Sequence, residues 1–398
     1  MSAATTTPHT PWPTVKLGDV CEVARGGSPR PIKSYITQAV DGLNWIKIGD
    51  VSPNGKYIEK TAEKIKPSGL NKTRQVAIGD FLLSNSMSFG RPYILKIDGC
   101  IHDGWLVLRG FRDVLEENFF YYLLRTEYVQ SQFDLHASGS TVRNLNTKSV
   151  ESVLIPLPPL EVQREIVAKV EAGLKEADGL VAHFKRLAAL ADDTFKAELD
   201  ETFNALSAPT VKLGDVCETC SGGTPLRTMR EYYEDGDIPW LRSGEVCQKD
   251  IVQTEMFITQ KGVDNSSAKK VPINTVVVAM YGATAGQVGI LRIESTTNQA
   301  VCGILPSEKH LPEFLYYQLL SMKNVMVSQA QGGAQPNISQ IKIKNLEIKF
   351  PSLDEQARIV ARLEAAKARC EQLKGWAERG LKAAEALRKA VLAEAFEQ

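Results

Sequence analysis

The chain has 398 residues, of which 43% are hydrophobic and 24% charged, and its 47 basic and 47 acidic side chains give no net charge. This length and composition predict an ordinary soluble protein of two or three domains. No apolar run approaches the ~18 residues that span a membrane, and Met1–Pro13 lacks the hydrophobic centre of a signal peptide, so we expect a cytoplasmic protein with no membrane contact.

The first domain is predicted to span residues 15–159, after a Thr/Pro-rich stretch, residues 1–14, that we expect to be a disordered tail. Short apolar runs bounded by Gly, Pro and Asn predict strands. An amphipathic pattern after them predicts a helix that packs on the sheet. These elements are the strands Asp80–Ser84, Tyr93–Ile97 and Trp105–Leu108 and the helix Glu116–Gln132. The domain is therefore expected to be mixed α/β.

Residues 160–205 are predicted to form one long helix. The run Pro156–Pro159 precedes it, and prolines forbid helix before that point but suit a first turn. Apolar or small residues then recur at alternating steps of four and three, which is the heptad seam of a helix that lies against another helix. The seam comprises Ile166, Val170, Gly173, Ala177, Leu180, Phe184, Leu187 and Ala191. Its many small residues favour a close-packed pair.

Residues 206–352 repeat the first domain. Val15–Glu22 returns unchanged as Val211–Glu218, and Gly26–Pro29 (Gly-Gly-Ser-Pro) returns as Gly222–Pro225 (Gly-Gly-Thr-Pro). The predicted elements of this copy are the strands Thr275–Met280 and Val288–Ile293 and the helix Pro312–Gln329. Between such elements the copies diverge, since Ser84–Arg91 stands where the second copy has Ala279–Gln287. A shared framework with different polar loops is expected of two domains that read different ligands, and divergence by drift is the alternative.

Residues 353–398 repeat the long helix, and Ser352–Glu355 before it fits a capping box. The second seam comprises Ile359, Leu363, Ala366, Cys370, Leu373, Ala377, Gly380 and Ala384. Because each helix follows a copy of the same domain, we expect the two seams to pair within one chain as an antiparallel coiled coil with pseudo-two-fold symmetry. The predicted fold class is α+β, with two mixed α/β domains separated by two long helices. A simple dimerisation coil between chains is the alternative.

Motifs for catalysis are missing from the sequence. It has no Asn-Pro-Pro-Tyr run for a flipped base and no Walker loop, since Gly282–Gly289 lacks the Lys-Ser/Thr pair that holds phosphate. The one Glu-x-Lys, Glu347–Lys349, has no nearby upstream acid, and the five histidines show no metal-ligand spacing. The lone C-x-x-C, Cys217–Cys220, is not repeated in the first copy, and scattered cysteines favour reduced thiols in a cytoplasm. We therefore predict a binding protein without enzymatic activity or a cofactor of its own.

Basic residues gather locally although the chain is neutral. The clusters are Lys60, Lys64, Lys66, Lys72 and Arg74 in the first domain, and Arg227, Arg230, Lys269 and Lys270 in the second. Each such cluster can also be an ordinary solvated face. Because phosphate neutralisation supplies most non-specific affinity for DNA, a neutral chain that reads nucleic acid needs a partner that adds contacts to the DNA phosphates.

The alternation of two variable domains with two matched helices resembles the DNA-specificity subunits of type I restriction-modification enzymes. Each domain opens with a Leu-Gly-Asp-Val phrase and Gly-Gly-Ser/Thr-Pro, and each helix begins with a Leu-x-x-Gln phrase shortly after a proline. The resemblance covers Val15 to Glu397. The first half departs from the family pattern in two places, since His102-Asp103 replaces Asn-Gln and Asn44-Trp45 replaces Pro-Trp.

The resemblance implies that each domain is a target-recognition domain that reads a few base pairs of a split site in double-stranded DNA, and that the helices fix the gap. It implies two copies of a modification subunit, which carry S-adenosylmethionine and methylate adenine. It also implies a restriction (motor-nuclease) subunit that uses ATP and Mg²⁺. Two other readings stay open: a specificity protein of another phage-defence or stand-alone methylation system, and a protein-binding scaffold that reads no DNA.

The expected DNA contacts lie in the divergent loops and basic clusters, because Arg can fork to guanine and Gln or Asn to adenine. In the first domain they are Arg30, Lys33, Lys72, Arg74, Ser86, Arg91 and His102. In the second domain they are Arg227, Arg230, Lys269, Tyr281, Gln287 and Asn298. For Asn298 and Tyr281 the alternative is a structural role, as caps of the sheet.

Overall fold

The computed structural model forms two compact units. The structure describes residues 12–52, 55–85, 89–137, 144–328 and 337–396. The first unit contains the described residues up to Phe184 and those from Arg379 onward, and the second unit is Lys185–Glu378. Each unit therefore holds one copy of the repeated domain, part of the first long helix and part of the second.

The domain of the first unit contains two five-stranded sheets and a two-stranded one. The orders are β2-β11-β8-β9-β5, β3-β6-β4-β10-β7 and β1-β12. The bounds are β1 Thr14–Lys16, β2 Glu22–Arg25, β3 Ile36–Thr37, β4 Leu43–Ile46, β5 Tyr57–Ile58, β6 Glu63–Ile65, β7 Arg74–Val76, β8 Phe81–Ser84, β9 Pro92–Leu95, β10 Gly99–Ile101, β11 Trp105–Arg109 and β12 Leu154–Pro156. The β4–β10 and β5–β9 pairs are parallel and the others antiparallel, so both larger sheets are mixed.

The domain of the second unit repeats this arrangement with sheets of five, four and two strands. The orders are β14-β22-β19-β20-β16, β17-β15-β21-β18 and β13-β23. The bounds are β13 Thr210–Lys212, β14 Thr219–Ser221, β15 Ile238–Leu241, β16 Asp250–Ile251, β17 Phe257–Ile258, β18 Lys270–Val271, β19 Val276–Ala279, β20 Val288–Leu291, β21 Ser295–Thr297, β22 Val301–Ile304 and β23 Glu347–Lys349. The parallel pairs are again equivalent, β15–β21 and β16–β20. The predicted strands are confirmed in both domains.

Short helices complete each domain. In the first unit they are α1 Leu17–Val20, α2 Glu117–Leu123, α3 Glu127–Ala137, α4 Thr147–Glu151 and the 3₁₀ turns η1 Ile32–Ser34, η2 Ile48–Asp50 and η3 Pro67–Lys72. In the second they are α6 Leu213–Val216, α7 Gln260–Asp264, α8 Pro312–Ser321, α9 Lys323–Ser328, α10 Gln340–Lys344 and the turns η4 Arg230–Tyr232, η5 Ser243–Glu245 and η6 Gly282–Thr284.

The prediction of one continuous helix over Glu116–Gln132 was wrong, because the structure has α2 and α3 with a break between them. At the break the Thr126 hydroxyl donates to Leu123 O and accepts from Val129 N, so the side chain competes with the helical backbone bonds. The helix predicted over Pro312–Gln329 is likewise divided into α8 and α9. Both patterns were amphipathic, and the sequence period does not show such a break.

The two long helices are confirmed as α5 Leu160–Ala205 and α11 Leu353–Phe396. All sixteen predicted seam residues are buried or half-buried. The predicted capping box is half formed, since Ser352 Oγ accepts from Glu355 N at 3.4 Å while the Glu355 carboxylate pairs with Arg358 at 2.6 Å.

Within each unit α5 and α11 run antiparallel. In the first unit Asp178 pairs with Arg388 at 3.1 Å, and a Cβ on Gly173 would meet Val391. In the second unit Asp192 pairs with Lys374, and further along α5 Glu198 pairs with Arg362 at 2.7 Å. Each unit thus contains the start of one long helix and the end of the other.

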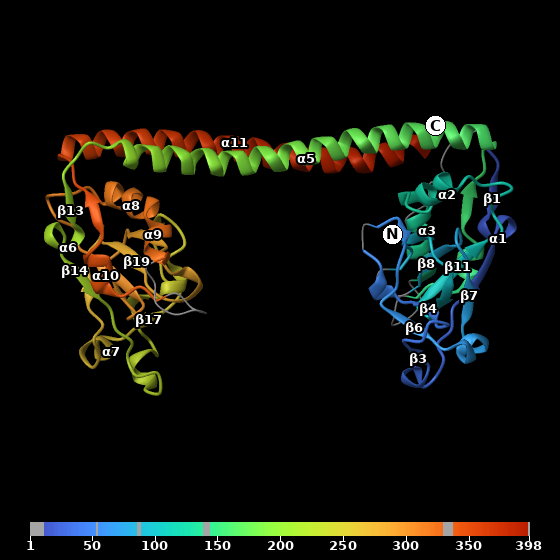
Figure 1. Ribbon diagram of the computed structural model, residues 1–398, viewed down its shortest axis with the longest axis horizontal. Coiled ribbons are helices and arrows are strands. Elements are labelled where there is room, and N and C mark those ends of the chain that lie inside the picture. The colour runs from blue at the N-terminus through green and yellow to red at the C-terminus, as the bar shows by residue number, and fades with distance from the viewer. Residues whose placement is uncertain (1–11, 53–54, 86–88, 138–143, 329–336, 397–398) are drawn as a thin grey trace. The chain divides into compact units, whose positions relative to one another are not determined.

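Equivalent aromatic contacts attach the helix pair to each domain. Phe119 of α2 packs on Phe396 of α11 with ring centroids 5.3 Å apart, and Phe314 of α8 packs on Phe203 of α5 at 5.8 Å. In Figure 1, α2 lies between strands β8 and β11 and the paired helices. Large buried side chains of this kind stabilise the attachment by about 2 kcal/mol each through burial of apolar area.

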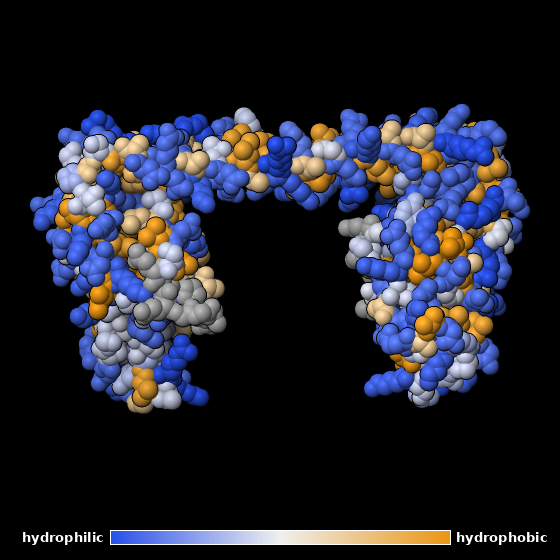
Figure 2. Space-filling model, in the orientation of Figure 1, coloured by the Kyte–Doolittle hydropathy of each residue, from blue (hydrophilic) through white to orange (hydrophobic). Residues whose placement is uncertain are grey.

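Hydrophilic residues cover most of the visible surface of both units (Figure 2). Among the described residues, no helix is long and apolar enough to cross a membrane. Over the same part of the chain, no group of three or more His, Cys, Asp and Glu side chains is placed to hold a metal ion.

Candidate nucleic-acid interface

The Gly-Gly loop of each domain is pressed against the backbone of a neighbouring strand end. In the first domain Gly26 N donates to Trp105 O at 2.9 Å and Gly27 N donates to Ile101 O at 3.1 Å. A Cβ on Gly26 would lie 2.1 Å from His102 O, and one on Gly222 would lie 2.0 Å from Thr297 O. Only glycine allows this approach, so the repeated Gly-Gly pair is a requirement of the loop framework.

The hydroxyl that follows the two glycines joins the same neighbouring loop in both domains. Ser28 Oγ donates to Asp103 Oδ1 at 2.7 Å, and the Thr224 hydroxyl donates to Gln299 Oε1. This hydrogen bond lowers the pKa of Asp103, because it favours the charged carboxylate. The polar loops after β2 and β10, and after β14 and β21, are therefore held together in the same way.

His102 and Asn298 hold the turns in which they lie. Gly104 N donates to His102 Nδ1 at 2.6 Å, and Ala300 N donates to Asn298 Oδ1 at 3.1 Å. The structure thus gives Asn298 the capping role that the sequence left as an alternative. The contact of either residue with a base stays a prediction.

Both ring nitrogens of His102 face backbone amides of its own domain. Its Nε2 faces Ile48 N at 3.2 Å, while Nδ1 faces Gly104 N. A protonated ring would set N–H against N–H at both places, so the site favours the neutral form. Burial lowers the pKa of His102, which also favours the neutral form. His102 therefore acts here as a loop-positioning residue.

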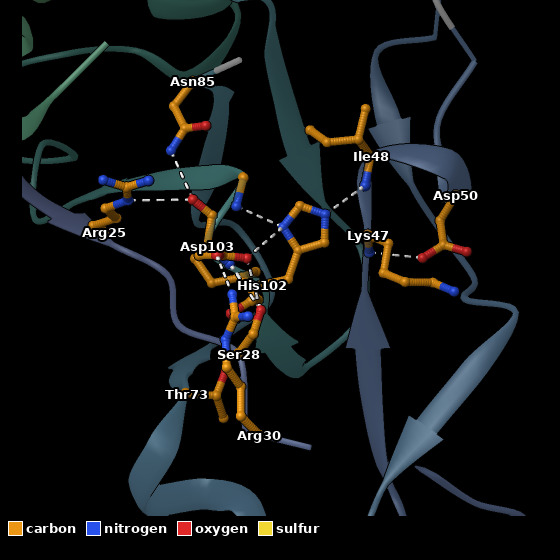
Figure 3. A network of polar contacts seen from close by, with 12 residues as sticks. Arg25, Ser28, Arg30, Lys47, Ile48, Asp50, Thr73, Asn85, His102 and Asp103 are labelled. Atoms are coloured by element: carbon orange, nitrogen blue, oxygen red, sulfur yellow. Dashed lines mark hydrogen bonds and ion pairs between the residues drawn. The ribbon is translucent and has the colours of Figure 1, made fainter. Parts of the chain in front are cut away.

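Two arginines, Arg25 and Arg30, contact Asp103 (Figure 3), and Arg74 contacts Arg25. Arg25 Nε donates to Asp103 O at 3.2 Å, Arg30 approaches the Asp103 carboxylate at 3.6 Å, and Arg74 Nε donates to Arg25 O at 2.9 Å. Asn85, buried at the end of β8, donates to Asp103 O at 2.8 Å. Loops from four separate strands therefore converge on one exposed basic cluster.

The second domain keeps the framework and lacks most of this cluster. Ser221 and Leu226 stand at the positions of Arg25 and Arg30, and Lys269 precedes the strand that corresponds to β7. Its other predicted cations are exposed: Arg227 lies near Tyr233, and Arg230 pairs loosely with Glu234 at 3.9 Å. The two domains present different charges on the same loops.

The remaining predicted residues lie around these loops. Lys72 donates to Tyr35 OH at 2.7 Å, Lys33 is exposed on η1, and Arg91 is exposed after β8 and interacts with Tyr93. Tyr281 and Gln287 flank η6 in the second domain. Ser86 lies outside the described residues.

The structure brings Arg30, Lys72, Arg74 and His102 to one edge of the first domain. Arg25, Asn85 and Asp103 of the same edge were missed in the sequence. The available signal was position, since Arg25 directly precedes the Gly-Gly pair and Asp103 directly follows His102.

Comparisons with known proteins agree with this two-fold construction. The sequence model of the family described as the type I restriction modification DNA specificity domain matches residues 9–177 and again 208–376. The specificity subunit of the Escherichia coli type I restriction enzyme EcoR124I/EcoR124II is 25% identical over 370 residues, which is 83% of this chain and 89% of that protein. The specificity subunit of the Escherichia coli enzyme EcoBI is 25% identical over 315 residues, 71% of this chain and 66% of that protein.

Solved structures share the fold. A chain from a study of assembly and conformational transition in a type I R-M system has a TM-score of 0.71 at 22% identity, with 97% of both chains covered. The HsdS subunit from Thermoanaerobacter tengcongensis has a TM-score of 0.63 at 20% identity, with 100% of this chain and 99% of that chain covered.

Proposed function

This chain belongs to the type I restriction-modification DNA specificity family, and on that premise we propose that it is the DNA-specificity subunit of such an enzyme and has no catalytic activity of its own. The proposal assigns target recognition to residues 15–159 and 206–352, each domain reading one half of a bipartite site. It places the protein in the cytoplasm with its DNA.

The observation that supports the proposal best is the contrast between framework and charge. Both domains close their loops with the same Gly-Gly pair and the same hydroxyl bond, to Asp103 in one and Gln299 in the other. The cations on those loops differ, with Arg25 and Arg30 in one copy and Ser221 and Leu226 in the other. Two domains that present different donors on one framework suit two different base sequences.

The catalytic steps then belong to partner subunits. Two modification subunits would bind S-adenosylmethionine and methylate adenine, and a restriction subunit would use ATP and Mg²⁺. A chain without net charge needs partners that contribute phosphate contacts, because these contacts supply most non-specific affinity.

The test is to express the chain together with its cognate modification subunit and to map methylated adenines on single DNA molecules. We expect a split, non-palindromic site, and no methylation with either subunit alone. A continuous palindromic site contradicts two independent recognition domains, and the absence of any preferred site contradicts a DNA-specificity function.

A further inference from the structure

The arginines around Asp103 have fewer acidic partners than Arg242 and Arg292 of the second domain. In the described part of the chain, the one ion pair made by Arg25, Arg30 or Arg74 joins Arg30 to the Asp103 carboxylate at 3.6 Å, and the Arg30 side chain is 82% exposed. The cluster therefore carries an excess of positive charge at an exposed edge.

Structural arginines of this protein look different. Arg292 uses its whole guanidinium, with bonds to Asp250, Asn274 and Glu313 at 2.6 Å each. Arg242 is held by Glu245 and Glu255. Such matched arginines hold the fold together, whereas the cluster at Asp103 has unmatched charge available to a ligand.

Arg25 and Arg74 are each held through one nitrogen of the guanidinium. Each uses Nε to donate to a main-chain carbonyl, at 3.2 Å and 2.9 Å respectively. Within the described residues, neither side chain makes a hydrogen bond or ion pair through its two terminal nitrogens, so the fork end remains available. A guanidinium fixed in this way loses less side-chain freedom on binding, which favours affinity.

We propose that Arg30, positioned by Asp103, reads a guanine edge in the half-site of the first domain, and that Arg25 and Arg74 hold flanking DNA phosphates. The inference rests on the proposed function and deepens it, since it names the chemistry of one recognition surface.

The Asp103 carboxylate distinguishes the arginine that suits a base from the arginines that suit phosphates. A phosphate next to Asp103 would meet a like charge, and the lowered pKa of Asp103 keeps that charge present at neutral pH. A guanine edge is neutral and presents two acceptors, O6 and N7, to the fork of an arginine. Arg30 pairs with the Asp103 carboxylate and therefore suits a base. Arg25 and Arg74 donate to the main-chain carbonyls of Asp103 and Arg25, make no contact with that carboxylate among the described residues, and suit phosphates.

The second domain supports the pairing of Arg30 with an acid. Where Leu226 replaces Arg30, Gln299 replaces Asp103, and the bond from the Ser28 or Thr224 hydroxyl persists. The hydroxyl alone does not need a carboxylate, because an amide oxygen accepts it equally. The negative charge at Asp103 is therefore present where Arg30 is present, and the hydroxyl bond of the loop framework does not require it.

The experiment uses the complex with the cognate modification subunit and a DNA library randomised over both half-sites. Arg30→Ala and Arg30→Lys should each reduce the preference at one guanine of the first half-site by about 5- to 150-fold, because lysine keeps the charge and loses the fork. Asp103→Asn should relax the same position while it keeps the Ser28 bond. Preferences in the second half-site and at the other positions of the first should not change, and the latter also shows that the substituted domain is folded.

Arg25→Ala and Arg74→Ala should instead weaken binding to all sequences and reduce the slope of log K against log salt by about 1 each. The base-reading role of Arg30 is overturned if Arg30→Ala keeps full preference, or if Arg30→Lys restores it, since a point charge would then suffice. The phosphate role is overturned if the salt slope of both variants equals that of the wild type. A wild-type complex with no bipartite preference is a separate result, and it contradicts the proposed function itself.

Discussion

Gln163 and Gln356 make the same three hydrogen bonds at equivalent positions of the two units. Both are fully buried at the start of a long helix. Gln163 Oε1 accepts from Glu116 N at 2.7 Å, and its Nε2 donates to Val114 O and Pro158 O, both at 2.8 Å. The partners of Gln356 are Leu311 N at 2.9 Å, Lys309 O at 3.2 Å and Pro351 O at 3.0 Å. This glutamine joins helix to domain in each unit.

Replacement of Gln163 by leucine should destabilise the first unit by about 2–4 kcal/mol, because the variant leaves the Glu116 amide and two carbonyls buried without partners. Hydrogen exchange at the Glu116 amide measures the local loss, and denaturant unfolding measures the total. Gln372→Leu is the matched control, since Gln372 is exposed on α11. Equal effects of the two substitutions would contradict the anchoring role of Gln163.

Substitution of His102 by asparagine should preserve the turn and remove a pH dependence. Asn298 already caps the equivalent turn through Oδ1. The pKa of His102 is lowered by burial, so the unfolded chain takes up a proton at about pH 6.5 before the folded protein does. Stability of the wild type should therefore fall as pH drops below about 6.5, and level off below the folded-state pKa of His102. Unfolding curves of both proteins over this range give the difference, and identical pH profiles would show that His102 titrates normally.

The ion pair of Lys249 with Glu364 should matter more than its counterpart in the first unit. Lys249 is 12% exposed, pairs directly with Glu364 of α11 and lies 5.4 Å from the ring centroid of Tyr317. Glu364→Gln should cost about 1–2 kcal/mol, a value kept low because Glu364 itself is 40% exposed.

The equivalent substitution, Glu171→Gln, should cost less than about 1 kcal/mol. Lys56, the counterpart of Lys249, donates to Asn118 Oδ1 at 2.5 Å. Glu171, the counterpart of Glu364, accepts a long hydrogen bond from Tyr122 OH at 3.5 Å. Thermal unfolding of the two variants compares them directly. A larger loss for Glu171→Gln would reverse the assignment of the stronger junction to the second unit.

Two helical glycines should respond in opposite directions to alanine. A Cβ on Gly380 would lie 2.3 Å from the Phe184 ring, whereas one on Gly179 would meet nothing within 4 Å. Gly380→Ala should therefore cost about 1–3 kcal/mol by overpacking the helix pair. Gly179→Ala should stabilise by about 0.5–1 kcal/mol through helix propensity. Thermal unfolding checks both, and a gain in both variants would show that the pair relaxes around Gly380.

The repeat and the long helices could be predicted from the sequence because both depend on patterns of residues that are close together in the chain. Identical phrases such as Val15–Glu22 and Val211–Glu218 require equivalent structure, and a heptad seam specifies a helix with a partner. The break at Thr126 escaped prediction, because its hydroxyl bonds depend on the local backbone and leave the apolar period unchanged.

The candidate site was decided by the tertiary structure. Arg30 and Arg74 could be chosen as exposed cations, but Arg25 and Asp103 gained their roles only where loops from distant strands meet. His102 shows the same limit, since its two ring nitrogens face the amides of Ile48 and Gly104. Residue type and spacing specify which groups can donate or accept, whereas the partner of each group depends on segments that only folding brings within hydrogen-bond distance.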